Sequence, residues 1–155
     1  MLKEKQSAPK FSCFNQDKET ITIDNFKDKN LVIFFYPKDL TPGCTIEAIE
    51  FTKAKEKFLE QNTEIIGVSK DSIESHKRFC EKKQLAINLL SDPDAKMLAD
   101  YGVWQEKSMF GKKYMGIVRS TFLIDKKGTI QKIWSPVKIK NHVKEVLEES
   151  KKLSL

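Results

Sequence analysis

The sequence LVIFFYPKDLTPGC, which runs from Leu31 to Cys44, decides the fold of this chain. Its first six residues are all apolar or aromatic, and such a run is typical of a strand that is buried on both faces of a sheet. Pro37 ends this strand, because proline has no N–H group to donate to a neighbouring strand. The sequence TPG at 41–43 predicts a tight turn, and the residues that follow have a helical composition. Cys44 is therefore expected at or just inside the N-terminus of a helix.

This expected position of Cys44 has a chemical consequence. A helix N-terminus presents unpaired backbone N–H groups and the positive end of the helix dipole, and both favour a nearby anion. The thiolate is the reactive form of cysteine, and a helix N-terminus favours it over the neutral thiol. We therefore interpret Cys44 as a reactive cysteine rather than as a buried structural one.

The same stretch resembles a known family. Pro37, Thr41 and Cys44 fit the Pro-x-x-x-Thr-x-x-Cys motif of peroxiredoxins, and the longer sequence FFYPKDLTPGCTIEAIEF resembles the peroxiredoxin Q branch, also called bacterioferritin-comigratory protein. The resemblance covers nearly the whole chain, since later segments also match. It implies a thioredoxin-like fold and a thiol peroxidase activity.

Length and composition narrow the class of protein. With 155 residues, the chain is expected to form one domain, residues 1–155, that can bury a core without disulfide bonds. The net charge of +6 comes mainly from lysines spread along the chain. A nucleic-acid-binding protein would cluster them, so nucleic-acid binding is not expected. No apolar run is long enough to span a membrane, and the N-terminus lacks the apolar core of a signal peptide. The expected location is the cytoplasm.

The remaining sequence predicts an α/β fold with a central mixed β-sheet flanked by helices. Beyond the strand already described, strands are expected at 11–14, 21–23, 64–69, 87–90, 117–125 and 129–134. Helices are expected at 45–61, 73–83, 95–101 and 141–153, and 103–116 is expected to be a surface loop. The helix after Cys44 joins two buried strands, which indicates a parallel pair, and the turn KKG at 126–128 indicates a hairpin. This arrangement fits the thioredoxin-like fold that the resemblance implies.

Peroxide reduction by a thiol needs a thiolate, a positioned O–O bond, a group that stabilises charge on the leaving oxygen, and a partly dry site. Thr41 lies three residues before Cys44, close enough for its hydroxyl to contact both the sulfur and a bound peroxide. Pro37 would shield the sulfur from water. The resemblance implies that the backbone N–H groups of Gly43 and Cys44 bind the peroxide.

The cation of this site is expected to be Arg119. The chain has only two arginines, and Arg119 begins the segment RSTFLID, which resembles the segment that carries the active-site arginine of the family. A guanidinium stays charged and offers forked donors, so it can hold a thiolate and a peroxide oxygen together. The other arginine, Arg78, is expected on the surface. Helical periodicity places Glu47 and Glu50 on the side that faces water, whereas the resemblance places at Glu47 a recurrent acid that bonds near the arginine.

The three cysteines, Cys13, Cys44 and Cys80, show no metal-binding spacing and no Cys-x-x-Cys pair. Attack on peroxide would leave Cys44 as a sulfenic acid, which condenses with a second thiol. Many peroxiredoxin Q proteins carry this resolving cysteine where this chain has Ile49. Others, which this chain resembles, carry the resolving cysteine on the next helix, where this chain has Cys80. In that helix Ser72 is the expected N-cap, and His76 is expected to be a satisfied residue at the edge of the core. Cys80 is therefore the expected resolving cysteine, and Cys13 is expected to be a small buried hydrophobe.

The resemblance implies reduction of hydrogen peroxide and organic hydroperoxides, and a Cys44–Cys80 disulfide that thioredoxin or a similar dithiol protein reduces. It implies no haem, flavin or metal, no membrane partner, and a monomer. Three alternatives stay open. One is a one-cysteine peroxidase in which Cys80 is a packed helix residue and an external thiol resolves Cys44, and another uses Cys13 as the resolver. The third is a different kind of protein, either a disulfide reductase on the same fold or a binding module with an inert thiol. The lack of a Cys-x-x-Cys pair disfavours the disulfide reductase.

Overall fold

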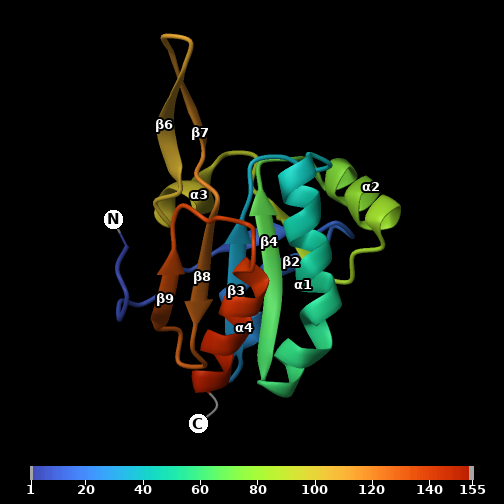
Figure 1. Ribbon diagram of the computed structural model, residues 1–155, viewed down its shortest axis with the longest axis vertical. Coiled ribbons are helices and arrows are strands. Elements are labelled where there is room, and N and C mark those ends of the chain that lie inside the picture. Colours follow the sequence, from blue (N-terminus) through green and yellow to red (C-terminus); the bar gives the residue numbers. More distant parts are fainter. Residues whose placement is uncertain (1, 154–155) are drawn as a thin grey trace.

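The structure of the chain is a computed structural model, and it describes residues 2–153 (Figure 1). Nine β-strands, four α-helices and one short 3₁₀ helix alternate along these residues. In chain order they are β1 (Ser12–Phe14), β2 (Thr20–Thr22), η1 (Ile23–Phe26), β3 (Asn30–Phe35), α1 (Pro42–Glu60), β4 (Thr63–Ser69), α2 (Ile73–Lys83), β5 (Asn88–Ser91), α3 (Lys96–Asp100), β6 (Trp104–Met109), β7 (Lys112–Ile117), β8 (Ser120–Ile124), β9 (Ile130–Trp134) and α4 (His142–Leu153).

Seven of the strands form one mixed sheet in the order β2-β1-β5-β4-β3-β8-β9. The three central strands β5, β4 and β3 are parallel to one another, whereas β8 pairs with β3 in the antiparallel sense and β9 pairs with β8 in the same way. The predicted α/β class, the parallel pair around the first long helix and the hairpin around residues 126–128 are thereby confirmed.

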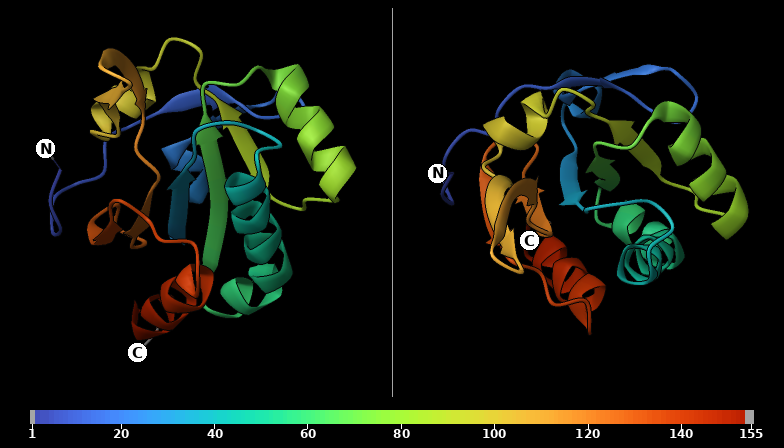
Figure 2. Two further views of the ribbon diagram at one scale, coloured as in Figure 1. Left: turned by 45° about the horizontal axis from the view of Figure 1, so that its top comes forward. Right: turned by 90° about the horizontal axis from the view of Figure 1, so that it is seen from above.

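Strand β3 lies inside the sheet, between β4 and β8, and all six of its residues are buried. Its side chains alternate between two apolar clusters, as expected for a strand covered on both faces. Val32 and Phe34 pack in a cluster with residues of α1, α2 and α4. Leu31 and Ile33 pack on the other face with α3 and the segment that includes Phe11. Figure 2 shows α1 and α4 on one side of the sheet and α3 on the other.

The predicted surface loop at 103–116 is wrong. Strands β6 and β7 pair in this region as a separate two-stranded hairpin that projects beyond the main sheet (Figure 1). Its turn is Phe110-Gly111, and both residues have a positive φ, the conformation that two-residue hairpin turns require. Because most of the hairpin lies away from the core, its strands lack the apolar alternation by which sequence patterns reveal half-buried strands.

The helices agree more closely with expectation. Helix α2 has the predicted bounds, and the Ser72 hydroxyl accepts a hydrogen bond from the Ser75 N–H, so the predicted N-cap is confirmed. Helix α1 begins earlier than expected, at Pro42, a residue suited to the first turn because its missing N–H would have no helical partner. Among residues 2–153, no helix combines the length and apolar character that a membrane crossing requires.

Candidate active site

Cys44 lies in the first turn of α1, just beyond the carboxyl end of β3. It is 1% exposed, so its sulfur is largely withdrawn from water. The first helical hydrogen bond runs from the Thr45 N–H to the Thr41 carbonyl, at 2.9 Å. The backbone N–H groups of Gly43 and Cys44 precede this bond, in the position from which a helix N-terminus binds anions. The expected placement of Cys44 at a helix N-terminus is confirmed.

Arg119 brings a fixed positive charge to the sulfur. It precedes β8 instead of beginning it, and its Nη2 donates to Cys44 Sγ at 3.2 Å. Its Nη1 donates to Glu47 Oε1 at 2.8 Å, so the two branches of the guanidinium hold two groups on α1. Burial alone would lower the pKa of Arg119, but the hydrogen bond and charge of Cys44, followed by those of Glu47, raise it. The guanidinium is therefore a permanent cation beside the thiol.

Glu47 is buried, so the expectation that it faces water is wrong. The residue is 0% exposed because the first turns of α1 lie over Arg119, 72 residues away in sequence. Its second oxygen, Oε2, has no hydrogen-bond partner among the described residues. Burial raises the pKa of Glu47 to about 7, although the neighbouring Arg119 acts in the opposite direction. The folded state therefore disfavours the ionised carboxylate.

This raised pKa predicts how stability changes with pH. Above the unfolded pKa of about 4.5, the unfolded chain ionises Glu47 freely while the folded chain resists ionisation. The stability that a protonated Glu47 contributes is therefore complete at pH 4 and is lost as the pH rises toward 7. The expected loss is about 3 kcal/mol of unfolding free energy between pH 4 and pH 8. Denaturant unfolding of the wild type and of Glu47→Gln across this range measures it.

The Glu47→Gln variant keeps an oxygen that accepts from Arg119 but cannot titrate, so the unfolding free energy of the wild type relative to this variant should fall as the pH rises. The exposed Glu74→Gln on α2 is the matched control, and its profile should run parallel to that of the wild type. Parallel profiles for Glu47→Gln and the wild type would contradict a raised pKa at Glu47.

Gly43 leaves room for the guanidinium to approach the helix. A Cβ atom at this position would lie 3.3 Å from Arg119 Nη2 and 3.0 Å from Cδ1 of Ile139. Any larger side chain at position 43 would therefore push on the group that donates to the Cys44 sulfur. Ile139, in the segment between β9 and α4, lies over the site, and no feature of the sequence pointed to it.

Thr41 and Pro37 occupy the loop before the helix. The Thr41 hydroxyl donates to the Lys38 carbonyl at 2.7 Å, and within residues 2–153 the structure shows no hydrogen bond from it to the Cys44 sulfur. The predicted contact between Thr41 and the sulfur is thus absent from this state. Pro37 is exposed and lies two residues beyond the end of β3.

The other two cysteines lie apart from this constellation, and all three thiols are free. Cys80 is half-buried on α2, where its pKa is raised to about 11, first by burial and then by the charges of Asp39, Asp17 and Glu81. Cys13 is half-buried on β1, with its Sγ 4.0 Å from the sulfur of Met97. Burial is also the main cause that raises the pKa of Cys13, to about 12. Both thiols are therefore protonated and unreactive in this packed form.

Asp39 is a buried acid in the active-site loop that sequence reasoning missed. It accepts hydrogen bonds from Tyr36 and Ser75 and lies 2.7 Å from His76, which is fully buried. The expectation of a satisfied His76 is confirmed, but at the centre of the packing instead of at its edge. The segment PKDLTPG at 37–43 has the composition of an ordinary surface loop. The sequence therefore gave no indication that Asp39 is buried.

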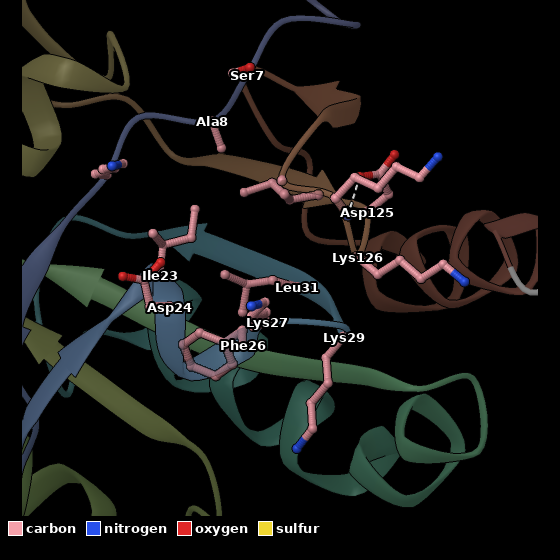
Figure 3. A pocket seen from close by; sticks show the side chains of 14 residues that line it. Ser7, Ala8, Ile23, Asp24, Phe26, Lys27, Lys29, Leu31, Asp125 and Lys126 are labelled. Atoms are coloured by element: carbon pink, nitrogen blue, oxygen red, sulfur yellow. Dashed lines mark hydrogen bonds between the residues drawn. The ribbon is translucent and has the colours of Figure 1, made fainter.

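A hollow at the opposite end of β3 is separate from this site (Figure 3). It has a volume of about 240 Å³ and lies between the start of β3 at Leu31 and the turn after β8 at Asp125 and Lys126. No cysteine or arginine lines it. The reactive chemistry of the described residues therefore gathers at the carboxyl end of β3, where Cys44, Arg119 and Glu47 meet.

Comparison with known proteins agrees with this geometry. The sequence model of the AhpC/TSA family matches residues 5–133. The chain is 48% identical over 149 residues to Peroxiredoxin Bcp of Bacillus subtilis (strain 168), a match that covers 96% of this chain and 95% of the relative. It is 40% identical over 141 residues to Peroxiredoxin Bcp of Escherichia coli (strain K12). That match covers 91% of this chain and 90% of the relative.

Solved structures give the same result at the level of the fold. The bacterioferritin comigratory protein of Xanthomonas campestris, studied for its alkyl peroxide reduction activity, superposes with a TM-score of 0.90 at 36% identity. That match covers 94% of this chain and 92% of the other. The predicted thioredoxin-like arrangement, a mixed sheet flanked by helices, is confirmed.

Proposed function

The chain belongs to the AhpC/TSA family and, within it, to the Bcp/PrxQ peroxiredoxins, which are thiol peroxidases, and from this premise we propose that Cys44 reduces hydroperoxides in a cycle that Cys80 completes. The observation that carries the proposal is the 3.2 Å hydrogen bond from Arg119 Nη2 to Cys44 Sγ. A permanent cation with forked donors, placed against a buried thiol at a helix N-terminus, stabilises the thiolate.

In the first step, the Cys44 thiolate attacks one oxygen of the hydroperoxide. An S–O bond forms while the O–O bond breaks, so the sulfur is oxidised to a sulfenic acid and the peroxide is reduced. The leaving oxygen departs as an alkoxide or hydroxide and takes up a proton to become an alcohol or water. Arg119, which contacts the sulfur, and the N–H groups of Gly43 and Cys44 in the first turn of α1 stabilise charge on the oxygens as the bond breaks.

Thr41 and Pro37 complete the site in this proposal. Once a peroxide is bound, the Thr41 hydroxyl can exchange its bond to the Lys38 carbonyl for one to the peroxide. The role proposed for Pro37 is to restrict the access of water to the Cys44 sulfur. Glu47 holds the second branch of Arg119 and so keeps the guanidinium aimed at the sulfur.

In the second step, the Cys80 thiol condenses with the Cys44 sulfenic acid. An S–S bond forms, the S–O bond breaks, and the hydroxyl leaves with the thiol proton as water. Structures of the Xanthomonas campestris peroxiredoxin Q include serine variants of two cysteines that lie 36 residues apart, the same separation as Cys44 and Cys80. This shared spacing supports Cys80 as the second thiol. Disulfide geometry needs the two Cα atoms within about 7 Å, so the helices must rearrange.

The substrates are alkyl hydroperoxides and hydrogen peroxide in this proposal, since the Xanthomonas campestris relative is described by its alkyl peroxide reduction activity. A dithiol protein of the thioredoxin kind then reduces the Cys44–Cys80 disulfide. In this proposal the chain acts as a monomer formed by a single domain. The reaction needs no haem, flavin or metal.

A coupled assay tests this function. The wild type should consume an alkyl hydroperoxide and hydrogen peroxide continuously when thioredoxin and its reductase are supplied. With a monothiol such as glutathione alone, turnover should be much slower. Sustained turnover with the monothiol and no response to thioredoxin would instead support a one-cysteine peroxidase. Rapid reduction of insulin disulfides without peroxide consumption would support a disulfide reductase.

A further inference from the structure

A buried polar cluster joins the active-site loop to α2. Asp39 lies in the loop between β3 and α1 and is 6% exposed. Its Oδ2 lies 2.7 Å from His76 Nδ1 and accepts a hydrogen bond of 2.8 Å from the Ser75 hydroxyl. Its Oδ1 accepts a hydrogen bond of 2.6 Å from the Tyr36 hydroxyl. Two consecutive residues of α2 therefore bind a single carboxylate of the loop that leads to Cys44.

The bond between Asp39 and His76 is a short, buried hydrogen bond. His76 Nε2 lies 2.9 Å from the Leu90 carbonyl oxygen, which can only accept, so Nε2 carries a proton. Burial alone would raise the pKa of Asp39, but its hydrogen bonds, led by that of His76, lower the pKa, and Asp39 is ionised. His76 Nδ1 faces this carboxylate at 2.7 Å. Both ring nitrogens of His76 thus lie against oxygen atoms, and the ionised Asp39 carboxylate makes the bond to Nδ1 a buried, charge-assisted one.

Asp71 adds a second attachment for the loop. Its Oδ2 accepts hydrogen bonds of 2.8 Å from the Asp39 N–H and from the Ser69 hydroxyl. The ligand atoms of Asp39, Asp71 and His76 lie within 4.8 Å of one another, a spacing that a metal ion could bridge. The loop acid and the histidine are instead bonded to each other, and Asp71 is occupied by its own donors. The hydrogen bonds of this cluster thus connect the active-site loop, the segment before α2, and α2 itself.

The loop stores backbone strain beside this cluster. Leu40 has a φ of 62°, in the left-handed region that a residue with a branched side chain rarely adopts. Such strain persists only where the surrounding structure fixes the backbone. The bonds of Asp39, next to Leu40 in sequence, supply that constraint, so their loss allows the loop to relax.

Cys80 lies one helical turn after His76, and the charge of Asp39 also acts on its thiol. The charge of Asp39 follows burial as a cause that raises the pKa of Cys80 to about 11. In the packed form Cys80 is therefore held as a protonated thiol. Separation of α2 from the loop would remove both influences and bring the pKa of Cys80 back toward its ordinary value.

We propose that the Asp39–His76 hydrogen bond is a latch that holds α2 against the active-site loop in the reduced enzyme, and that its release limits the rate at which Cys80 reaches oxidised Cys44. This inference rests on the proposed Cys44–Cys80 cycle. Asp39 and His76 are positioning residues, since they act through the placement of the two cysteines.

The latch also sets how sensitive the enzyme is to excess peroxide. While Cys44 waits as a sulfenic acid, a second hydroperoxide can attack it. Another S–O bond then forms as an O–O bond breaks, which yields a sulfinic acid and an alcohol or water. The longer the latch keeps Cys80 away, the larger the fraction of Cys44 that takes this route. A weaker latch should give faster disulfide formation and less sulfinic acid.

Ser75→Ala tests the latch with little disturbance. It removes one hydrogen bond to Asp39, while the Ser75 backbone N–H still donates to the Ser72 cap. We expect disulfide formation about fivefold faster than in the wild type, equivalent to one net hydrogen bond, with an unchanged rate of the first oxidation of Cys44. Asp39→Asn keeps the shape but removes the charge, and it should accelerate disulfide formation further. Rapid quenching with an alkylating reagent after one equivalent of peroxide, followed by mass spectrometry, measures both steps.

Ile130→Val in β9 is the matched control, because Ile130 is fully buried in the other apolar cluster. It should lower thermal stability without a change in disulfide formation or sulfinic acid yield. Equal disulfide rates in the wild type, Ser75→Ala and Asp39→Asn would overturn the latch, as would slower rates in the two variants. If the wild type formed no Cys44–Cys80 disulfide at all, the proposed cycle itself would fail, and this outcome is distinct from equal rates.

Discussion

Replacing Arg119 with methionine is expected to lower the rate constant for oxidation of Cys44 by peroxide by about 10²–10³-fold, the range found when a donor that stabilises developing charge is removed. Methionine fills similar space but has neither charge nor N–H donors. The variant lacks the 3.2 Å hydrogen bond from Arg119 to the sulfur, so both the thiolate and the leaving oxygen lose their fixed cation. Stopped-flow measurement of a single oxidation under excess peroxide gives the rate constant directly.

Arg78→Met is the matched control for this prediction, since Arg78 is the other arginine of the chain and is exposed on α2. It should leave the rate constant unchanged. The loss of Arg119 also leaves Glu47 buried without its partner, which destabilises the fold. The double variant Glu47→Gln/Arg119→Met relieves that cost. If its oxidation were as fast as that of the wild type, Arg119 would act on stability and not on the reaction.

Cys44→Ser should reduce peroxide consumption to the rate of the buffer. A serine hydroxyl stays protonated at neutral pH and is a weak nucleophile without an adjacent base, so Arg119 cannot convert it into a substitute for the thiolate. Peroxide consumption is measured in the presence of the dithiol reductant. Serine closely matches cysteine in size, so the fold and the guanidinium position should persist, and thermal unfolding checks this.

Cys13→Ser is the control for the nucleophile. Cys13 is half-buried on β1 beside Met97, on the face of the sheet opposite to Cys44, and it should not affect the rate. Residual peroxide consumption in Cys44→Ser that disappears only when Cys13 is also replaced would show that the reactive thiol had been wrongly assigned.

The features that the sequence predicted well are those that local physics decides. The apolar run at 31–36 is typical of a buried strand, and the turn and helix after it placed Cys44. Arg119 was found because a lysine-rich chain with two arginines makes each of them conspicuous, and because its segment resembled the family. Neither argument needed knowledge of which segments pack together.

The features that the sequence did not predict depend on contacts between distant segments. Glu47 has the helical period of a water-facing residue, and only the approach of Arg119, 72 residues later, makes its burial possible. Asp39 is a loop acid whose partners come from α2. The β6–β7 hairpin shows little apolar alternation, because most of its length projects from the fold instead of forming part of the core.

The two-cysteine cycle is tested most directly by non-reducing mass spectrometry with peptide mapping after one equivalent of hydroperoxide, on the wild type, Cys44→Ser and Cys80→Ser. We expect the wild type to lose the mass of two hydrogen atoms and to yield a peptide pair linked through Cys44 and Cys80. Neither variant should yield that pair, and Cys80→Ser should accumulate sulfenic or sulfinic acid at Cys44. A wild type that carries an oxidised Cys44 beside an unmodified Cys80 would contradict the two-cysteine cycle, and an unmodified Cys44 would contradict its role as the thiol that peroxide oxidises.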